Sequence, residues 1–212
     1  MNKVELTPNT YKGKLIVFEG TDGAGKTTLI NLTYKYLKDK YPNKEVILLK
    51  QPTEEARNSR LFQKMMFDEN HENINYRAVQ LLTLSDRIQH NHEVIIPALK
   101  EGKIIICDRY IYTSIANMKA RNYRNENWFY LASKEIIKPD ISFLAFVEPE
   151  IAISRIKARE EEKDRYLDET LLKRVTNEFL LLALQEGLKV IDSSTSSDIT
   201  FEYIKKELDK YV

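Results

Sequence analysis

The chain has 212 residues, of which 42% are hydrophobic and 31% charged, a composition typical of a globular protein with one full core rather than of a disordered chain. Its 33 basic and 32 acidic side chains leave a formal net charge of +1. This balance argues against broad electrostatic binding to nucleic acid or to a membrane surface.

Residues 1–12 are predicted to form an N-terminal tail, and residues 13–212 a single domain. The tail lacks the apolar core of a signal peptide, and no run approaches the length of a membrane span. The single cysteine, Cys107, cannot form an internal disulfide, and its apolar neighbours indicate a buried, inert thiol. We therefore expect a cytoplasmic protein.

A glycine-rich loop lies between the first expected strand, 15–18, and the first expected helix, 27–37. It follows the pattern G-x-x-x-x-G-K-[ST], in which backbone N–H groups surround the oxygens of a polyphosphate. The lysine then reaches the β- and γ-phosphates, the threonine hydroxyl can ligate Mg²⁺, and the helix dipole favours the anion. A glycine-rich turn that merely joins strand to helix is the weaker alternative. The expected ATP-binding residues are Gly20, Thr21, Asp22, Gly23, Ala24, Gly25, Lys26, Thr27 and Thr28.

Short apolar runs and helical stretches alternate along the rest of the chain. The further expected strands are 45–49, 103–107, 141–147 and 188–191, and a polar loop is expected from Gln51-Pro52 onward. Helical stretches are expected at 73–100, 112–121, 128–137 and 201–211, and Pro97 should kink or break the first of them. This order predicts an α/β fold, a five-stranded parallel sheet flanked by helices on both faces, as in P-loop kinases. Ligands of such sheets bind at the carboxyl ends of the strands.

Two charged positions are candidates for that edge. Asp108 directly follows a strand, where a carboxylate can complete a Mg²⁺ shell, although an ion pair with Arg109 would also explain it. Arg87, on the long helix, could clamp an acceptor phosphate or pair with a neighbouring acid on the helix surface.

The charge run 155–165 has two interpretations as well. It is either a solvated helix or part of a mobile lid, around 155–168, that carries arginines onto the transferring phosphoryl group. His71, His90 and His92 form no ligand set and are expected at the solvated surface, while 128–130 is expected to pack in the core.

From about residue 14 to the C-terminal helix, the chain resembles the thymidylate kinases. The residues that carry this resemblance are 18–28, 85–87, 108–110 with Thr113, Ser114 and Ala116, and 138–140. The resemblance implies a nucleoside monophosphate kinase of nucleotide biosynthesis that transfers the γ-phosphoryl group of ATP to dTMP with Mg²⁺. It also implies a homodimer formed through the long helices.

The resemblance further implies roles for individual residues. Asp22 would hold the sugar 3′-hydroxyl, Arg87 and Arg109 the acceptor phosphate, and Pro52 would line the acceptor pocket. Asp108 would help to place Mg²⁺ and the attacking oxygen. Ala24 stands where some members carry a catalytic arginine in the loop, which makes the lid arginines Arg155, Arg159 and Arg165 the candidates here. The expected catalytic residues are Lys26, Asp108, Arg109, Arg159 and Arg165, and the expected metal ligands are Thr27 and Asp108.

The departures from the family pattern concern the base pocket. Thr83 and Asn117 stand where aromatic residues are common, and Gln51 precedes Pro52 where many relatives carry a charged or aromatic residue. A nearby ring, Tyr110 or Tyr112, could compensate. The expected substrate-binding residues are Asp22, Pro52, Thr83, Arg87, Arg109, Ser114 and Asn117.

Two other functions remain open. The first is a kinase of the same fold for another (deoxy)nucleotide or a nucleoside, which for a nucleoside would need Glu19 or Asp108 as a general base. The second, less favoured, is a nucleotide-dependent regulatory module.

Overall fold

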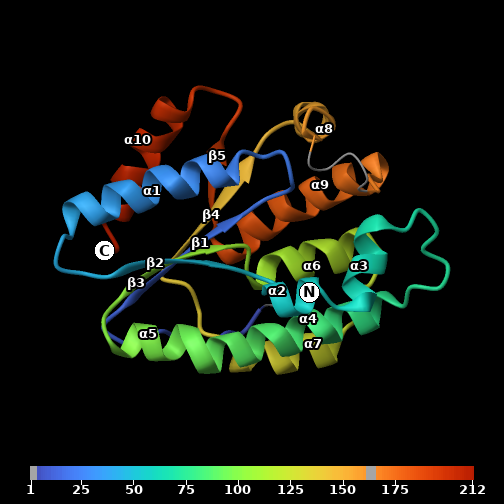
Figure 1. Cartoon of the computed structure of the whole chain (residues 1–212), viewed down its shortest axis with the longest axis horizontal. Helices are drawn as coiled ribbons and strands as arrows, with labels where there is room; N and C mark the ends of the chain where they lie inside the picture. Colours follow the sequence, from blue (N-terminus) through green and yellow to red (C-terminus); the bar gives the residue numbers. More distant parts are fainter. Residues whose placement is uncertain (1–3, 161–165) are drawn as a thin grey trace.

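One parallel sheet organises the chain in a computed structural model that describes residues 4–160 and 166–212 (Figure 1). Its strand order is β2-β3-β1-β4-β5, and every pairing is parallel. The strands are β1 (Lys14–Glu19), β2 (Val46–Lys50), β3 (Ile104–Asp108), β4 (Ile141–Phe146) and β5 (Lys189–Asp192). The predicted five-stranded parallel sheet is confirmed.

Helices connect the strands. They are α1 (Lys26–Lys40), α2 (Glu54–Arg57), α3 (Arg60–Phe67), α4 (Tyr76–His90), α5 (Ile96–Lys100), α6 (Ile111–Ala120), α7 (Asn127–Ala132), α8 (Pro149–Lys157), α9 (Glu169–Glu186) and α10 (Ser197–Leu208). A π-helical turn, η1 (Asn91–Ile95), joins α4 to α5, and a 3₁₀ turn, η2 (Ser133–Glu135), follows α7. In the described part of the chain, none of the helices is both long and apolar enough to cross a bilayer.

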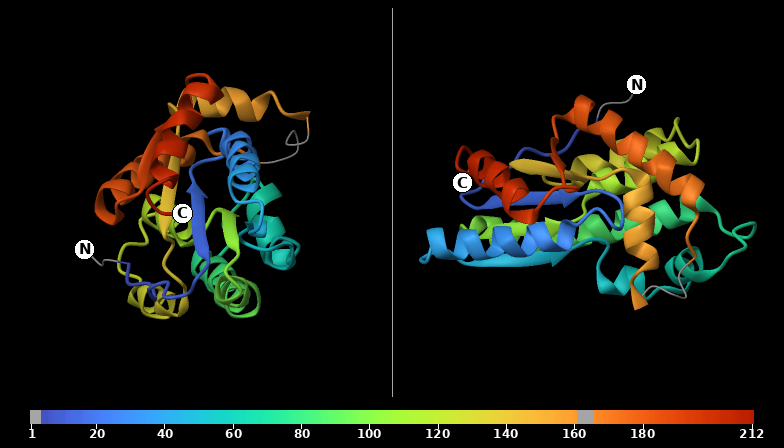
Figure 2. Two further views of the ribbon diagram at one scale, coloured as in Figure 1. Left: turned by 90° about the vertical axis from the view of Figure 1, so that its left-hand side faces the viewer. Right: turned by 90° about the horizontal axis from the view of Figure 1, so that it is seen from above.

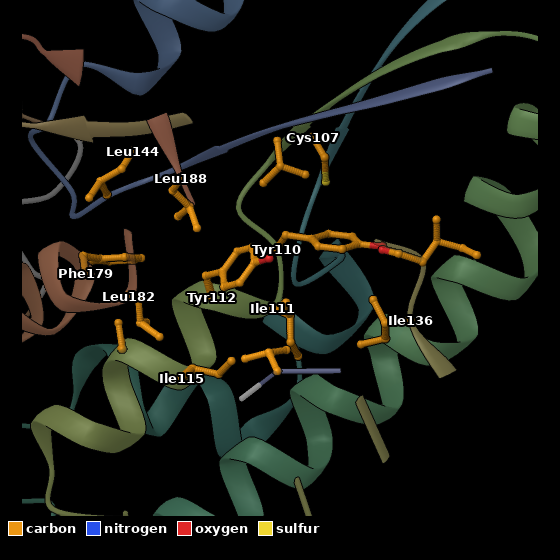
Figure 3. Close-up of a cluster of buried hydrophobic side chains, with 14 of the residues drawn as sticks. Cys107, Tyr110, Ile111, Tyr112, Ile115, Ile136, Leu144, Phe179, Leu182 and Leu188 are labelled. Carbon is orange, nitrogen blue, oxygen red and sulfur yellow. The ribbon is translucent and has the colours of Figure 1, made fainter. Parts of the chain in front are cut away.

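Helices cover both faces of the sheet, as predicted (Figure 1 and Figure 2). Side chains alternate along each strand, so Leu15 and Val17 of β1 pack on one face against α5, α6 and α9. Ile16 and Phe18 pack on the other face against α1, α8 and α10. Cys107 lies in the first of these two clusters (Figure 3), where burial raises the pKa of its thiol well above the usual value. The expected buried thiol is confirmed.

Two helices replace the polar loop predicted after the second strand, so that prediction was wrong. Helix α3 begins at a serine cap, because the Ser59 hydroxyl accepts a hydrogen bond from the Phe62 amide at 3.3 Å. Its sequence includes Leu61, Phe62, Met65 and Met66, an apolar set at helical spacing. The short α2 and α3 bring this apolar face over the carboxyl ends of the strands.

The long helical stretch before β3 is interrupted, as predicted, but ahead of Pro97. The Ile96 amide donates to the Asn91 carbonyl, the i to i−5 spacing of a π-turn, and Pro97 lies in the first turn of α5. The turn leaves the Asn91 side chain fully buried, where its Nδ2 donates to the Arg87 carbonyl at 2.9 Å. Its Oδ1 accepts from the Tyr110 hydroxyl at 2.8 Å. The break in the helix thus fastens the end of α4 to the segment that follows β3.

Candidate functional site

The glycine-rich loop runs from the end of β1 to the start of α1, as the sequence predicted. Gly23 has a φ of 79°, and a Cβ atom there would lie 2.4 Å from the Ala152 carbonyl oxygen, so this position requires glycine. Lys26 is buried, and its Nζ donates to the carbonyls of Gly20 at 3.0 Å and Thr21 at 2.7 Å. Burial, together with the charge of nearby Arg109, lowers the pKa of Lys26 to about 8. The lysine is therefore folded onto the loop and still largely protonated at neutral pH.

Arg109 joins two parts of the predicted site. It directly follows β3 with a φ of 66°, and its amide donates to the Phe18 carbonyl of β1 at 2.8 Å. Its guanidinium donates to the Gly20 carbonyl at 2.9 Å and forms an ion pair with the Asp22 carboxylate. Burial opposes the charge on Arg109, but Asp22, Asp108 and Glu19 together raise its pKa. The partner of Arg109 is thus Asp22, whereas the sequence left open an ion pair with Asp108.

Glu19 holds the segment that follows Arg109 in place through hydrogen bonds. It is fully buried, and it accepts hydrogen bonds from the amides of Tyr110 at 3.0 Å and Thr113 at 3.1 Å and from the Thr113 hydroxyl. Burial raises the pKa of Glu19, and the bonds from Thr113 oppose that rise. Glu19 therefore fastens the first turn of α6 and is not among the residues that line the cavity described next.

A cavity of about 350 Å³ opens beside the loop. Residues predicted for the site line it from six different segments, namely Thr21, Asp22, Gly23, Gly25, Lys26, Thr27, Pro52, Thr83, Arg87, Asp108, Arg109, Ser114, Asn117 and Arg159. Gly20, Ala24 and Thr28 complete the loop without lining this cavity, and Arg165 lies outside the described residues. The fold thus gathers most of the predicted residues around one space.

Arg87 lies in the wall of this cavity and is only 1% exposed. Its Nε donates to the Tyr110 carbonyl at 3.2 Å and its Nη1 to the Thr83 carbonyl at 2.9 Å. Burial lowers the pKa of Arg87 to about 10, so the side chain keeps its charge at neutral pH. An ion pair on the helix surface, one of the two interpretations of Arg87, is therefore wrong.

Sequence reasoning missed several residues that line the cavity, including Arg57, Phe62, His71, Gln80, Arg121 and Tyr166. Arg57 at the end of α2 donates from Nε to the Pro52 carbonyl at 2.8 Å, and its guanidinium lies 5.8 Å from the Phe62 ring centre. Burial lowers the pKa of Arg57, and nearby Arg109 adds to that effect. No motif marks Arg57 in the sequence, because it belongs to the segment predicted as a loop.

Two of the three histidines are not solvated, which corrects that prediction. The Nδ1 of His71 bonds with the Tyr76 hydroxyl at 2.6 Å, and the ring lines the cavity. The Nδ1 of His90 bonds with the Nε2 of Gln51 at 3.0 Å, and burial lowers the pKa of His90. Gln51, one of the departures from the family pattern, is thus buried against α4. His92 is exposed, as predicted.

Neither Tyr110 nor Tyr112 faces the cavity, so the expected compensation by one of these rings is wrong. Figure 3 shows both rings in the hydrophobic cluster, with the Tyr112 ring between Leu188 and Ile115. The Tyr110 hydroxyl is 2.9 Å from the Ile137 carbonyl oxygen, and neither tyrosine is among the residues that line the cavity. The cavity is instead lined by other aromatic rings, which include those of Phe62, Tyr166 and Phe179.

Thr83 and Asn117 do lie on the cavity wall, from α4 and α6 respectively. The Thr83 hydroxyl donates to the Gln80 carbonyl at 3.3 Å. The Asn117 Nδ2 donates to the Thr113 carbonyl at 2.9 Å, and its Oδ1 accepts from Arg121 at 2.8 Å. Polar side chains held by intrahelical bonds therefore stand where a stacking ring was expected.

A second hollow of about 420 Å³ lies on the other side of the loop. It is lined by Gly23, Gly25, Thr28, Leu29, Arg155, Ala158, Arg159, Ser193, Thr195, Ser197 and Thr200. Arg155 donates to the carbonyls of Gly23 and Ser193, each at 3.2 Å, and the Ser193 hydroxyl donates to the Ala24 carbonyl at 2.6 Å. Arg155 and Ser193 thus hold the loop in place, whereas Arg159, Gly23 and Gly25 border both hollows.

The sequence of the chain was compared with a family model and with known proteins. A family model described as thymidylate kinase matches residues 18–204. A probable thymidylate kinase from Pyrococcus horikoshii is 36% identical over 177 residues, which are 81% of this chain and 83% of that relative. Thymidylate kinases from Thermosipho africanus and Caldicellulosiruptor saccharolyticus are each 34% identical over 93% of this chain and over 98% and 97% of their own lengths.

Proposed function

Because the chain belongs to the thymidylate kinase family, we propose that it transfers the γ-phosphoryl group of ATP to the 5′-phosphate of dTMP, giving dTDP and ADP. One observation carries this proposal beyond the family: a single phosphate-binding loop separates two hollows that share Gly23, Gly25 and Arg159. The hollow beside Arg155 and Ser193 takes the nucleoside of ATP. The cavity beside Arg109 takes dTMP, so that the two phosphate chains meet at the loop.

The acceptor phosphate is already ionised at neutral pH, so the reaction needs alignment and charge neutralisation more than it needs a base. Lys26 holds the β- and γ-phosphates, and Arg87 and Arg109 hold the acceptor. Asp22 binds its 3′-hydroxyl, and Asp108 helps to place the attacking oxygen. Pro52, Thr83, Ser114 and Asn117 form the walls of the acceptor site. The ion pair between Asp22 and Arg109 supports these roles because it holds both groups at the mouth of the loop.

A magnesium ion fits this site. Asp108 carries a buried Oδ1 with no hydrogen-bond partner among the described residues, and Thr27 is exposed at the start of α1. Mg²⁺ commonly uses one or two protein ligands beside phosphate oxygens and water, which agrees with the absence of a larger His, Cys, Asp and Glu cluster in the described part of the chain. Thr27 and Asp108 would hold the ion, which when bound neutralises charge on the phosphates.

Residues 155–168 serve as the lid of this proposed enzyme. Arg159 is its catalytic arginine, since it borders both hollows and can reach the transferring phosphoryl group. Arg155 belongs to the ATP side, where it braces the loop. Arg165 remains a second catalytic candidate outside the described residues. Closing such a lid would exclude water and suppress hydrolysis of ATP.

The proposal includes a cytoplasmic homodimer that acts on small nucleotides and not on nucleic acid. The buried thiol of Cys107 and the balanced charge support the location and the substrates. Exposed apolar side chains on the long helices, Leu81 on α4 with Leu181 and Leu184 on α9, support association through those helices. Sedimentation equilibrium of the whole chain tests the dimer.

Coupled release of ADP in the presence of Mg·ATP tests the reaction against dTMP, dUMP, UMP, dCMP, dGMP and thymidine. Preferred turnover of dTMP supports a thymidylate kinase, and preference for another nucleotide overturns the base assignment. A nucleoside kinase would prefer thymidine and would tolerate loss of Arg87. Absence of acceptor-dependent turnover would favour a regulatory module.

A further inference from the structure

A buried amide oxygen on the cavity wall has no hydrogen-bond partner in the described part of the chain. Gln80 of α4 lines the acceptor cavity, is only 6% exposed, and carries an Oε1 atom for which no hydrogen-bond donor exists among the described residues. Leaving a buried acceptor unpaired is destabilising. A ligand N–H in the cavity would supply the missing donor, and the broad terminal torsion of glutamine lets the amide turn toward it.

Gln80 lies at the end of the cavity away from the phosphate chemistry. It precedes Arg87 by seven residues on α4, or about 10 Å along the helix axis. Arg87 is bonded to Tyr110, which follows Arg109 in the segment after β3, and Asp108 is the last residue of β3. An acceptor whose phosphate lies at Arg109 would therefore extend its base toward Gln80.

The same end of the cavity holds a second unpaired polar atom. The Nε2 of His71 is buried without a partner among the described residues, while its Nδ1 bonds with Tyr76, one helical turn before Gln80. Thr83, between Gln80 and Arg87, offers no ring for stacking, and its hydroxyl is committed to the Gln80 carbonyl. Two hydrogen-bonding atoms without a partner among the described residues thus mark this end of the cavity.

We propose that Gln80 is a specificity-determining residue that reads the imide edge of the acceptor pyrimidine. Its Oε1 accepts from the ring N3–H, and its Nε2 donates to a neighbouring ring carbonyl, a two-bond match that thymine and uracil offer. Cytosine presents an unprotonated N3 beside an amino group, the reverse donor and acceptor pattern, which does not match the amide in this orientation. This inference rests on the proposed function, because it assigns the base-reading residue of that same acceptor site.

The test compares two acceptors, dTMP and dTMP methylated at N3, with three proteins. These are the wild type, Gln80→Met and the control Gln89→Met, which replaces an exposed glutamine on the same helix. The wild type should prefer dTMP over the N3-methylated analogue by at least about tenfold in kcat/KM, and Gln80→Met should shrink that preference at least about fivefold. The control should keep the wild-type ratio, and all three proteins should share one KM for ATP.

Thermal melting distinguishes recognition of the base by Gln80 from a structural role of this residue. Since the Gln80 Oε1 makes no internal hydrogen bond, Gln80→Met should melt no lower than the wild type. An unchanged preference in Gln80→Met, equal loss of turnover on both acceptors, or a lowered melting temperature would each overturn the inference. If the wild type phosphorylates no nucleotide at all, the proposed function itself has failed, a result distinct from these three.

Discussion

Arg109 and Asp22 form an ion pair that joins the end of β3 to the phosphate-binding loop after β1. The pair depends on the sheet, because β1 and β3 are neighbours and Phe18 is in register with Asp108. The Arg109 backbone has a φ of 66°, which turns its side chain back over the loop. Two groups 87 residues apart in sequence are thereby held together at one cavity.

Loss of this arginine should impair transfer more than it impairs binding of ATP. Arg109→Ala removes a positive charge that faces the developing charge of the phosphates, so kcat/KM for dTMP should fall about 100-fold or more. Steady-state kinetics with each substrate varied in turn measures the effect. Arg124→Ala, which breaks a half-exposed pair with Glu178, is the control and should leave kinetics unchanged. Equal effects of the two variants would contradict the assignment.

Arg57 should contribute to acceptor binding although no motif marks it. Because its guanidinium lies in the acceptor cavity near Arg109 and Asp108, Arg57→Ala should raise KM for dTMP about tenfold, the effect of one charge-assisted hydrogen bond. KM for ATP should not change. Arg60→Ala, an exposed arginine on the next helix, serves as the matched control. A rise in KM for ATP instead would place Arg57 on the donor side.

Lys26 should make capture of ATP dependent on pH. In the proposed mechanism the free enzyme binds the triphosphate through the protonated amine, and burial lowers the pKa of that amine to about 8. The protonated fraction falls as pH rises through this value, so kcat/KM for ATP should decline above about pH 8. A pH profile of kcat/KM measures the decline, and Lys26→Arg should remove it because arginine stays charged. A wild-type profile that is flat up to pH 10 would refute the role.

Arg155 and Arg159 should differ in kinetic effect although they lie on the same segment. Arg159→Ala should lower kcat at least about 100-fold with little change in either KM, because its role is in the transition state. Arg155→Ala should mainly raise KM for ATP, since Arg155 holds the loop at Gly23 and Ser193. Exchanged phenotypes would reverse the two roles. If both variants behave like the wild type, Arg165 would become the candidate for the catalytic arginine.

Gly23 should tolerate substitution less well than another glycine of similar conformation. Gly23 and Gly187 have φ values of 79° and 76°, but a Cβ atom would collide with the Ala152 carbonyl only at Gly23. Gly187→Ala should cost about 1 kcal/mol, or 2 to 4 °C in melting temperature, from backbone strain alone. Gly23→Ala should lose more than that and should also lose ATP binding, which calorimetry can follow. Equal losses of stability in Gly23→Ala and Gly187→Ala would show that the loop moves to avoid the contact between the new Cβ atom and the Ala152 carbonyl.

The parts of the site that the sequence predicted well are local in the chain. The loop from Gly20 to Thr28 is one continuous motif, and Asp108 and Arg109 are marked by the strand they follow. A parallel sheet brings these segments together, because the carboxyl ends of its strands lie at one edge.

The missed parts depend on side-chain direction and on packing. Tyr110 and Tyr112 follow Arg109 closely, but both rings pack in the core, where Asn91 accepts a hydrogen bond from the Tyr110 hydroxyl and Glu19 accepts one from the Tyr110 amide. Arg57 and His71 come from segments with no motif. The packing of α2 against α4 brings Arg57 to the cavity, and the bond to Tyr76 at the start of α4 holds His71 there.

By itself, then, the sequence determined the class of fold, the phosphate-binding loop and the carboxylate and arginine after β3, because each follows from residues adjacent in the chain. The tertiary structure decided which side chains face the acceptor. The packing of each helix sets its rotation, and that rotation places Gln80 and Arg87 at the cavity and Tyr112 in the core. Such rotations arise from contacts between residues far apart in sequence, which no local pattern records.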